Sequence, residues 1–576
     1  MILNLIVIAL VGLIAYLWSS HGLFSAFIHF VCTLVAAALA WALWELSVYQ
    51  LWLGLKQDIA WGVGLMLPFL VFLVVLRLAA DALIRKNMEF DDVTNFVGGL
   101  AFGAMSGVIS IGMLVIAMGF MRLPPSILGY TPVDYDANGN LVRSGSLWLP
   151  VDTIVVKGFE MMSAGSLATT TPLAQFYPDA HLQAAATRTT FGGKGRTTLT
   201  PDDFQIVSRY TLPADSLSDT FVLNAEGQPV PQQAKDLSGE TYPPSSVIEG
   251  YVVKLGAGAK EKSGQFVVGP GTVRLVTHDE SGAKVLLPVA VVSRVSAGSL
   301  DMSRWRFDGK EVFITSVGGA SDALFAFEFV VPPNSPAGRT LYVRNVRAEL
   351  PTAAPAAFTS VQARDDAVRA RSDVFERLVA GATVDPNAAQ QPTQSAAAPI
   401  TDPIRIDSRL PGAINKQNKG GMELDAQNRV IDGQATLERK LFGVQGLGRE
   451  ITVERFAETS DTVVVQVDVS IRSRVSLFGR AMDTAQGVLK PTLVDSLGQS
   501  YDAVGYIYDT GEAVTIRFTP GRPIRQFSEL PSLSRSRPNE RLILLFRPSA
   551  GVTLTRFMLG GQTLEEMNMT LPGGRG

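Results

Sequence analysis

Four long apolar segments occupy the first 122 residues and give the chain its strongest pattern. They cover residues 2–18, 23–44, 59–76 and 96–121, and none of them contains a Lys, Arg, Asp or Glu. A helix needs about 20 apolar residues to cross the hydrocarbon core of a bilayer, and helical geometry satisfies the backbone hydrogen bonds that lipid cannot. The pattern therefore predicts four transmembrane helices. The first segment has neither a basic start nor a small-residue cleavage site, so we expect it to be retained as a span.

A row of glycines runs along the fourth apolar segment. Gly99, Gly103 and Gly107 recur every fourth residue and share one helix face. Small residues at this spacing allow the backbone of a second helix to come close. We expect the row to pack against another helix of the same bundle, with a dimer interface as the alternative. Gly112 and Gly119 lie beyond this uninterrupted row, and we expect substitutions there to be milder.

Basic residues near the segment ends predict the orientation in the membrane. Arg77, Arg85 and Lys86 lie near the connection between the third and fourth segments, whereas Lys56 and Arg122 lie on the opposite side. Basic residues concentrate on the cytoplasmic side of membrane proteins. This distribution places the N-terminus and everything after residue 122 outside the cytoplasm of a bacterial inner membrane.

With its glycine row and its tight first and third connections, the N-terminal region resembles the colicin V production protein family, CvpA. The last span of that family opens with an Asp-Arg pair and continues as Gly-xxx-Gly-xxx-Gly. Here Asn95-Phe96 stands where the pair would be, Asp91-Asp92 lies a turn earlier, and His21-Gly22 replaces the family's Arg-Gly in the first connection. The resemblance covers only the first 122 residues. It implies an N-out, C-out topology, large extracytoplasmic domains and a link to toxin production or export.

Ionisable residues in or beside the membrane are costly and are therefore candidate functional groups. His29 lies within the second segment, where it can serve a proton relay or simply bond a neighbouring helix. Arg77, Asp81 and Arg85 are spaced four residues apart and can form a ladder of charges at the cytoplasmic edge, as an anchor or a gate. A conducting pore normally needs several rings of charge, and the four segments contain no charged residues. An oligomeric channel or transporter component is therefore kept only as the alternative function.

From about residue 200 the apolar period changes to two, which is typical of strands. Short β-branched and aromatic segments follow one another, separated by Gly, Pro, Asn and Ser. They form two series, residues 203–331 and residues 449–546. Each series predicts an antiparallel sandwich of the immunoglobulin-like type.

The two series are related in sequence. Residues 274–285 (RLVTHDESGAKV) parallel residues 492–501 (TLVDSLGQSY). Residues 329–346 likewise parallel residues 544–559, and both contain Ala-Gly-x-Thr-Leu. We interpret the series as two copies of one sandwich, with chance similarity of ordinary hairpins as the alternative.

These patterns divide the chain into five parts. They are a four-helix CvpA-like membrane domain (1–122), a juxtamembrane segment with an amphipathic helix (123–198), a first β-sandwich (199–351), a helix and Pro/Ala/Gln linker (352–403) and a second β-sandwich (404–576). The amphipathic helix, residues 151–162, can lie on the membrane surface or pack on the first outer domain. A further helix is predicted at 361–379, and residues 381–403 lack any apolar pattern.

The chain lacks the residue patterns of common catalytic and metal sites. Outside the apolar segments His181 and His278 are the only histidines apart from His21, and no Gly-x-Ser-x-Gly nucleophile turn is present. Cys32, the single cysteine, excludes an intrachain disulfide. The basic turn FGGKGRTT at 191–198 lacks Walker spacing, although an anion remains an alternative occupant. Asn138-Gly139 predicts a hairpin turn and not a calcium loop.

The sequence thus predicts a non-enzymatic membrane protein without a cofactor or metal, which displays two β-sandwiches for binding or scaffolding in the cell envelope. The expected partners are the lipid bilayer and an envelope protein, with a homo-oligomer as a further option. A formal net charge of −3 spread over 576 residues gives no sign of nucleic-acid binding.

Overall fold

The computed structural model of the chain describes residues 2–573 with internal gaps. The gaps are residues 56, 85–87, 89, 136–140, 166–168, 190–195, 197, 215–217, 224–228, 234–240, 262–264, 270, 281, 295–301, 308–312, 316–321, 349, 352–353, 371–402, 444–447, 478–489, 534–536, 538 and 561. Most of the basic turn, apart from Arg196 and Thr198, and most of the predicted linker therefore lie outside the described residues, as does Arg85.

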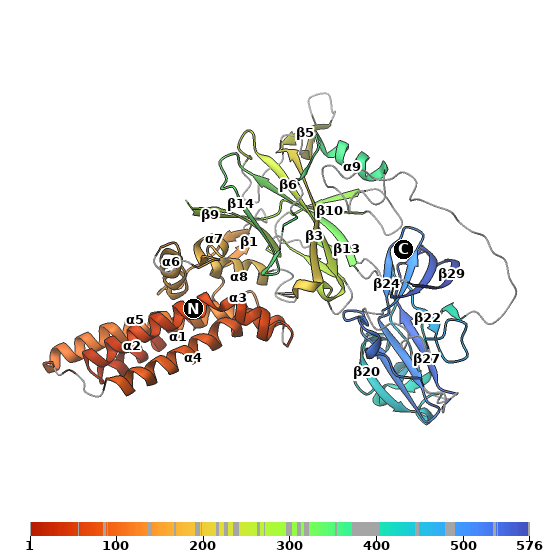
Figure 1. The fold of residues 1–576 in the computed structure, drawn as a ribbon, viewed down its shortest axis with the longest axis horizontal. Helices are drawn as coiled ribbons and strands as arrows, with labels where there is room; N and C mark the ends of the chain where they lie inside the picture. The colour runs from red at the N-terminus through yellow and green to blue at the C-terminus, as the bar shows by residue number, and fades with distance from the viewer. Residues whose placement is uncertain are drawn as a thin grey trace.

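Four helices form an elongated bundle, drawn in red and orange in Figure 1. They are α1 (Ile2–Ser19), α2 (Leu23–Ala42), α4 (Ala60–Leu83) and α5 (Asp92–Gly119). Each of these is long and apolar enough to cross a membrane. Helix α5 packs against the other three. Asp91 caps the start of α5 by accepting a hydrogen bond from the Thr94 backbone N–H at 2.9 Å.

The second helix ends earlier than its apolar pattern predicts. Helix α2 stops at Ala42, because Leu43 leaves helical geometry (φ −100°, ψ 5°). A short helix α3 (Trp44–Ser47) and a π-helical turn η1 (Val48–Trp52) follow. The Leu53 N–H closes the π turn by donating to the Val48 carbonyl at 2.9 Å. The last two residues of the predicted second span, Leu43 and Trp44, thus lie in an irregular element that packs against α4.

Three short helices lie between the bundle and the sheets (Figure 1). They are α6 (Val151–Ser163), α7 (Leu173–Phe176) and α8 (Ala180–Thr189); the apolar pattern predicts only the first. Helix α6 packs on α5. The sequence predicts that this helix lies on the membrane surface or on the first outer domain, and neither option includes a contact with α5. Before them, β1 (Val133–Tyr135) and β2 (Leu141–Arg143) pair antiparallel, while the predicted Asn138-Gly139 turn lies among the undescribed residues.

The first β region contains two main sheets. The six-stranded sheet has the order β11 (Met302–Arg306), β10 (Ala290–Arg294), β13 (Asp322–Val331), β6 (Val247–Gly256), β3 (Phe204–Pro213), β16 (Ala356–Ala357). The four-stranded sheet has the order β15 (Val346–Ala348), β14 (Gly338–Val343), β8 (Val273–Asp279), β9 (Gly282–Leu286). Two small pairs accompany them, β7 (Phe266–Val268) with β12 (Phe313–Thr315) and β4 (Ser218–Leu223) with β5 (Pro229–Gln233).

The second β region also contains two main sheets. The seven-stranded sheet has the order β17 (Ile404–Ile406), β22 (Val465–Asp468), β27 (Arg541–Phe546), β25 (Gly505–Asp509), β26 (Ala513–Phe518), β20 (Val430–Glu438), β19 (Met422–Leu424). The four-stranded sheet has the order β24 (Ser500–Asp502), β23 (Pro491–Asp495), β28 (Thr553–Leu559), β29 (Gln562–Thr570). A separate pair joins β18 (Arg409–Asn415) to β21 (Thr452–Arg455).

The two regions share one strand order. In chain order, β3, β6, β8, β9, β10, β11, β13, β14 and β15 correspond to β17, β22, β23, β24, β25, β26, β27, β28 and β29. Within the larger sheets the order 11-10-13-6-3 matches 26-25-27-22-17, and within the smaller sheets 15-14-8-9 matches 29-28-23-24. All these neighbours pair antiparallel in both regions. The segments that parallel each other in sequence fall on corresponding strands.

The strand period of two divides the first six-stranded sheet into two covered faces. Val253 and Phe327 share a core with Leu275 and Leu341 of the four-stranded sheet, so the two sheets pack face to face. The next residue along β6, Val252, points the other way into a second cluster. Helix α9 (Val361–Ala370) reaches this second face. Helix α9 corresponds to the first part of the predicted 361–379 helix, and residues 371–379 lie outside the described residues.

Candidate functional site

An aromatic joint connects the helical bundle to the first β region. Trp44 and Trp61 are each 1% exposed, and their ring centroids lie 5.1 Å apart. Trp44 also contacts Phe120 and Tyr177, and Tyr177 contacts Tyr342 of β14. The fold therefore encloses both tryptophans, and neither lies at the surface of the bundle.

Hydrogen bonds fix the joint as well as ring packing. The Trp44 indole N–H donates to the Trp61 carbonyl, and the Trp61 indole N–H donates to the Thr198 hydroxyl, both at 2.9 Å. Buried indole N–H groups normally need such partners. The bundle and the first β region therefore meet through packed and hydrogen-bonded side chains, in addition to the chain itself.

A group of polar side chains lies beside the aromatic joint. Glu45 of α3 accepts a hydrogen bond from the Tyr177 hydroxyl at 2.5 Å and from Arg347 Nη2 of β15 at 3.2 Å. The Tyr49 hydroxyl of η1 accepts from the Arg347 backbone N–H at 3.2 Å. The Arg347 guanidinium also lies over the Phe176 ring, 5.3 Å from its centroid. Four separate elements thus orient one carboxylate and one guanidinium.

Burial and charge shift the pKa values in this group. Burial raises the pKa of Tyr49 to about 12, despite the opposing hydrogen bond from Arg347. Burial also raises the pKa of Tyr177, and neighbouring Tyr342 and Glu45 raise it further. Burial alone would lower the pKa of Arg347, but Glu45 and the surrounding tyrosines outweigh it and raise that pKa. The tyrosines are therefore neutral, and Arg347 is a permanent cation.

These side chains border a cavity of about 390 Å³, which we call the junction cavity. Its wall is formed by the end of α2, by α3 and η1, by α6 and by Thr169–Thr171, with Tyr177 and Arg347 at one side. Its volume falls within the roughly 300–1,000 Å³ typical of ligand pockets. The indole N–H of Trp41, which also lines the cavity, is buried without an acceptor among the described residues. π turns such as η1 often occur at functional sites.

The polar residues predicted inside the bundle come together around Trp18. The His29 ring stacks on Trp18 with centroids 3.9 Å apart, and the Arg77 guanidinium lies 5.0 Å from the Trp18 ring. Arg77 pairs with Asp81 at 2.8 Å and donates to the Ser25 hydroxyl at 3.0 Å. The predicted partner Arg85 lies outside the described residues. His29, Arg77 and Asp81 therefore form one compact group.

The predicted glycine row faces helix α1. A Cβ added to Gly103 would lie 2.9 Å from the Ala15 Cα, and one added to Gly99 would lie 2.9 Å from the Ser19 Cα. At Gly107 the nearest backbone atom, the Val11 carbonyl oxygen, would lie 3.1 Å away. The row thus lies at a contact within the bundle, where no side chain fits without movement.

Gly112 does not behave as its register suggests. A Cβ there would lie 2.6 Å from the Val151 carbonyl oxygen and 2.5 Å from Val155 Cγ2 of α6. At Gly119 the nearest atom would be the Ala184 Cβ at 3.5 Å, an ordinary contact. The expectation of a mild effect therefore fits Gly119 but is wrong for Gly112, because α6 supplies a second close neighbour that the four-residue register does not reveal.

The two outer histidines lie apart from each other. His181 is buried near Asp152 and Thr153, and burial lowers its pKa. His278 shares a hydrogen bond with the Thr340 hydroxyl at 3.0 Å. Within the described part of the chain no three His, Cys, Asp or Glu side chains gather closely enough to hold a metal ion.

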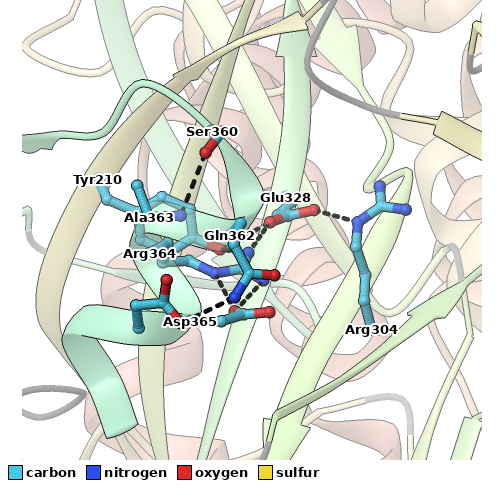
Figure 2. Close-up of polar contacts among 9 residues, drawn as sticks. Tyr210, Arg304, Glu328, Ser360, Gln362, Ala363, Arg364 and Asp365 are labelled. Atoms are coloured by element: carbon cyan, nitrogen blue, oxygen red, sulfur yellow. Dashed lines mark hydrogen bonds and ion pairs between the residues drawn. The ribbon is translucent and has the colours of Figure 1, made fainter. Parts of the chain in front are cut away.

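A second charged cluster lies inside the first β region (Figure 2). Glu328 of β13 is fully buried and receives hydrogen bonds from the Tyr210 hydroxyl at 2.8 Å, from Arg304 Nε at 2.6 Å and from Arg364 Nη1. Arg364 belongs to α9 and also bonds Asp365. This cluster fastens α9 to the six-stranded sheet, and its closed geometry suits a structural role.

Comparison with family models, with curated proteins and with solved structures finds no match.

Sequence reasoning missed the junction cavity. Glu45 lies 132 positions from Tyr177 and 302 positions from Arg347, so no local motif contains the group. The available signal was a lone carboxylate, Glu45, directly after an apolar segment that ends in two tryptophans.

Proposed function

We propose that the chain is an integral inner-membrane protein of the CvpA type, which presents two immunoglobulin-like sandwiches outside the cytoplasm for binding or scaffolding in the cell envelope. The observation that carries the proposal is the joint. Trp44, Trp61 and Tyr342 fix the first β region at one end of an apolar bundle, an arrangement suited to holding a binding module at a set distance from a membrane.

The shared strand order supports the immunoglobulin-like assignment of both copies. If β3, β6, β8, β9, β10, β13, β14 and β15 are named A, B, C, C′, D, E, F and G, the sheets read A-B-E-D and G-F-C-C′. This is the strand arrangement of immunoglobulin-type sandwiches. β11 then extends the D edge. The second region gives the same reading, with β26 in place of β11.

The resemblance to CvpA supplies the link to toxin production or export, which we retain as part of the proposal. The alternative function, an oligomeric channel or transporter component, draws support from the group of His29, Arg77 and Asp81 around Trp18. The buried His29 Nδ1 has no hydrogen-bond partner among the described residues. A proton relay would use such a nitrogen to exchange a proton with water.

Partner capture tests the binding role. The full chain and a chain ending at residue 403 would be crosslinked in intact cells, purified in mild detergent and compared by mass spectrometry. A binding role predicts envelope proteins that are enriched with the full chain and lost with the shortened one. Identical partner lists, or a proton flux through liposomes carrying the purified chain that His29→Ala abolishes, would favour the transport role instead.

A further inference from the structure

We propose that the junction cavity binds a membrane phospholipid with a zwitterionic, amine-bearing headgroup, of the phosphatidylethanolamine class. The inference rests on the proposed function in one respect, namely that the bundle lies in a bilayer. The proposed presentation of β-sandwiches requires no ligand in the junction cavity, so the bound lipid goes beyond that function.

The cavity lies at the end of an exposed apolar face of α2. Val31, Val35 and Ala42 of α2 are exposed and are spaced at intervals of about one or two turns, and Leu46 of the following helix α3 is exposed as well. Ala42 and Leu46 also line the cavity. A fatty acyl chain lying along this apolar face would end at the mouth of the cavity. A lipid therefore has a continuous path from the bilayer into the site, which a free soluble anion would not need.

The polar end of the cavity carries one cationic and one anionic side chain, which can pair with the phosphate and the ammonium group of a zwitterionic headgroup. Arg347 offers a planar guanidinium, the group best suited to phosphate oxygens, and its stacking on Phe176 limits its motion. Glu45 offers a carboxylate that can accept hydrogen bonds from an ammonium group. Their side chains are 34% and 18% exposed, so both remain accessible while paired. Because the pair is neutral overall, it favours a zwitterionic headgroup over an anionic one.

Two further groups match the remaining parts of a phospholipid. Thr169–Thr171 line the cavity, and threonine hydroxyls can donate to phosphate oxygens. The buried Trp41 indole N–H lacks an acceptor among the described residues, and leaving such a donor unpaired costs about 1–3 kcal/mol. A glycerol ester carbonyl would supply the acceptor, since tryptophan occupies this depth of the membrane interface.

Native mass spectrometry of the full chain in mild detergent tests the proposal. Phosphatidylethanolamine and phosphatidylglycerol of equal chain length would be added separately, and inorganic phosphate in a third arm. We expect one tightly held phosphatidylethanolamine per chain, which survives the collision energy that removes phosphatidylglycerol. Equal retention of both lipids, or occupancy by inorganic phosphate without lipid, would overturn the proposal.

Two variants locate the bound lipid. Ala42→Trp fills the mouth and leaves Glu45 and Arg347 intact, whereas Arg347→Gln removes the cation. Each should weaken retention by about tenfold or more, equivalent to about 1.4 kcal/mol. Val71→Trp is the matched control, because Val71 is an exposed residue of α4 outside the cavity wall. Unchanged retention in Ala42→Trp, with an unchanged melting temperature, would contradict the proposed site.

The same preparations separate this inference from the proposed function. A chain that alkaline carbonate releases from membranes is not an integral membrane protein, and the proposed function would then fail. A chain that stays in the membrane but retains no phosphatidylethanolamine would overturn only the lipid site.

Discussion

At the scale of single residues, Glu328 shows how this chain uses a buried charge. Burial by itself would raise the pKa of Glu328, but Arg304 and Arg364 outweigh it and hold that pKa below the usual 4.5. A carboxyl group with a lowered pKa in the folded state stabilises the fold above its unfolded pKa. This stabilisation disappears as the pH falls through the folded value.

We therefore predict that Glu328→Gln changes the acid sensitivity of the first β region. At pH 7 the variant should lose about 3–5 kcal/mol of stability, because it leaves two buried guanidinium groups without their carboxylate. Scanning calorimetry of the full chain from pH 7 to pH 3 should show the two proteins converging only below the usual carboxyl range. Glu438→Gln is the control, since the Glu438 side chain is 63% exposed. Parallel curves for wild type and Glu328→Gln would refute the prediction.

The glycines of α5 give a second prediction at this scale. Gly103→Leu should force α1 and α5 apart and cost about 1–3 kcal/mol or more from overpacking. Gly112→Leu should be similarly damaging because of α6, whereas Gly119→Leu should be mild. The measurement is the melting temperature and the yield of inserted protein in detergent.

Two outcomes would revise this picture. A Gly103→Leu chain that is folded but monomeric, where the wild type is oligomeric, would make the row a subunit interface. Wild-type behaviour of both Gly103→Leu and Gly119→Leu would make the row a lipid-facing surface.

At the scale of elements, the second β region is built to fold by itself. Its two cores are formed only by residues between 404 and 571. Contacts to the first region include the Arg525–Asp203 ion pair at 2.5 Å and a Gln499–Asp322 hydrogen bond at 3.3 Å. Such polar contacts contribute little compared with the apolar cores.

We expect limited proteolysis to cut within residues 381–403 before either β region is degraded. The fragment beginning at residue 404 should be soluble and rich in β-structure by circular dichroism, because it keeps its complete cores. Cleavage within α6 is the internal comparison. Because that helix is packed against α5, it should be cut later than residues 381–403. An unfolded or aggregated fragment would show that the second copy depends on the first.

The elements also show how far sequence reasoning reached. The four apolar helices follow from the length of uninterrupted apolar segments, and the β-rich remainder follows from an apolar period of two. The break at Leu43 could not be predicted, since apolar residues continue past it to Trp44 and the first charged residue, Glu45, comes only afterwards. The missed helices α7 and α8 are short, and tertiary packing rather than a local period determines them.

The candidate site was less predictable than the fold. Gly99, Gly103 and Gly107 could be assigned to a helix contact because small-residue spacing reports close approach directly. Glu45 and Arg347 could not be joined, because their contact exists only after the bundle and the first β region have docked. Arg85 gives no structural answer, since it lies outside the described residues.

At the scale of the whole molecule, both ends of the membrane region lie on the same side of the bundle. The Leu3 N–H donates to the Leu128 carbonyl at 3.1 Å, and the Trp148 N–H donates to the Asn4 side chain at 2.8 Å. At the opposite end the Leu23 N–H donates to the Asn95 side chain at 3.3 Å. If the four helices cross a membrane as proposed, this even number of crossings keeps the N-terminus and both β regions on one side.

Reporter fusions test which side that is. A reporter that works only in the periplasm should be active when fused after Arg122 or Gly576, and inactive when inserted at Asn87. A cytoplasmic reporter should give the reverse. The physical reason is the excess of basic residues near the connection that holds Asn87. The inverted pattern would contradict both the charge rule and the resemblance to CvpA.

The close contact between α1 and α5 has a consequence for the order in which the protein can assemble during its synthesis. Ribosomes make α1 first, yet the glycine face on which it packs arrives only with residues 99–107. The joint likewise cannot close before Phe120 and Tyr177 have been made. Both the packing of the helical bundle and its attachment to the first β region can therefore be completed only after α5 has been synthesised.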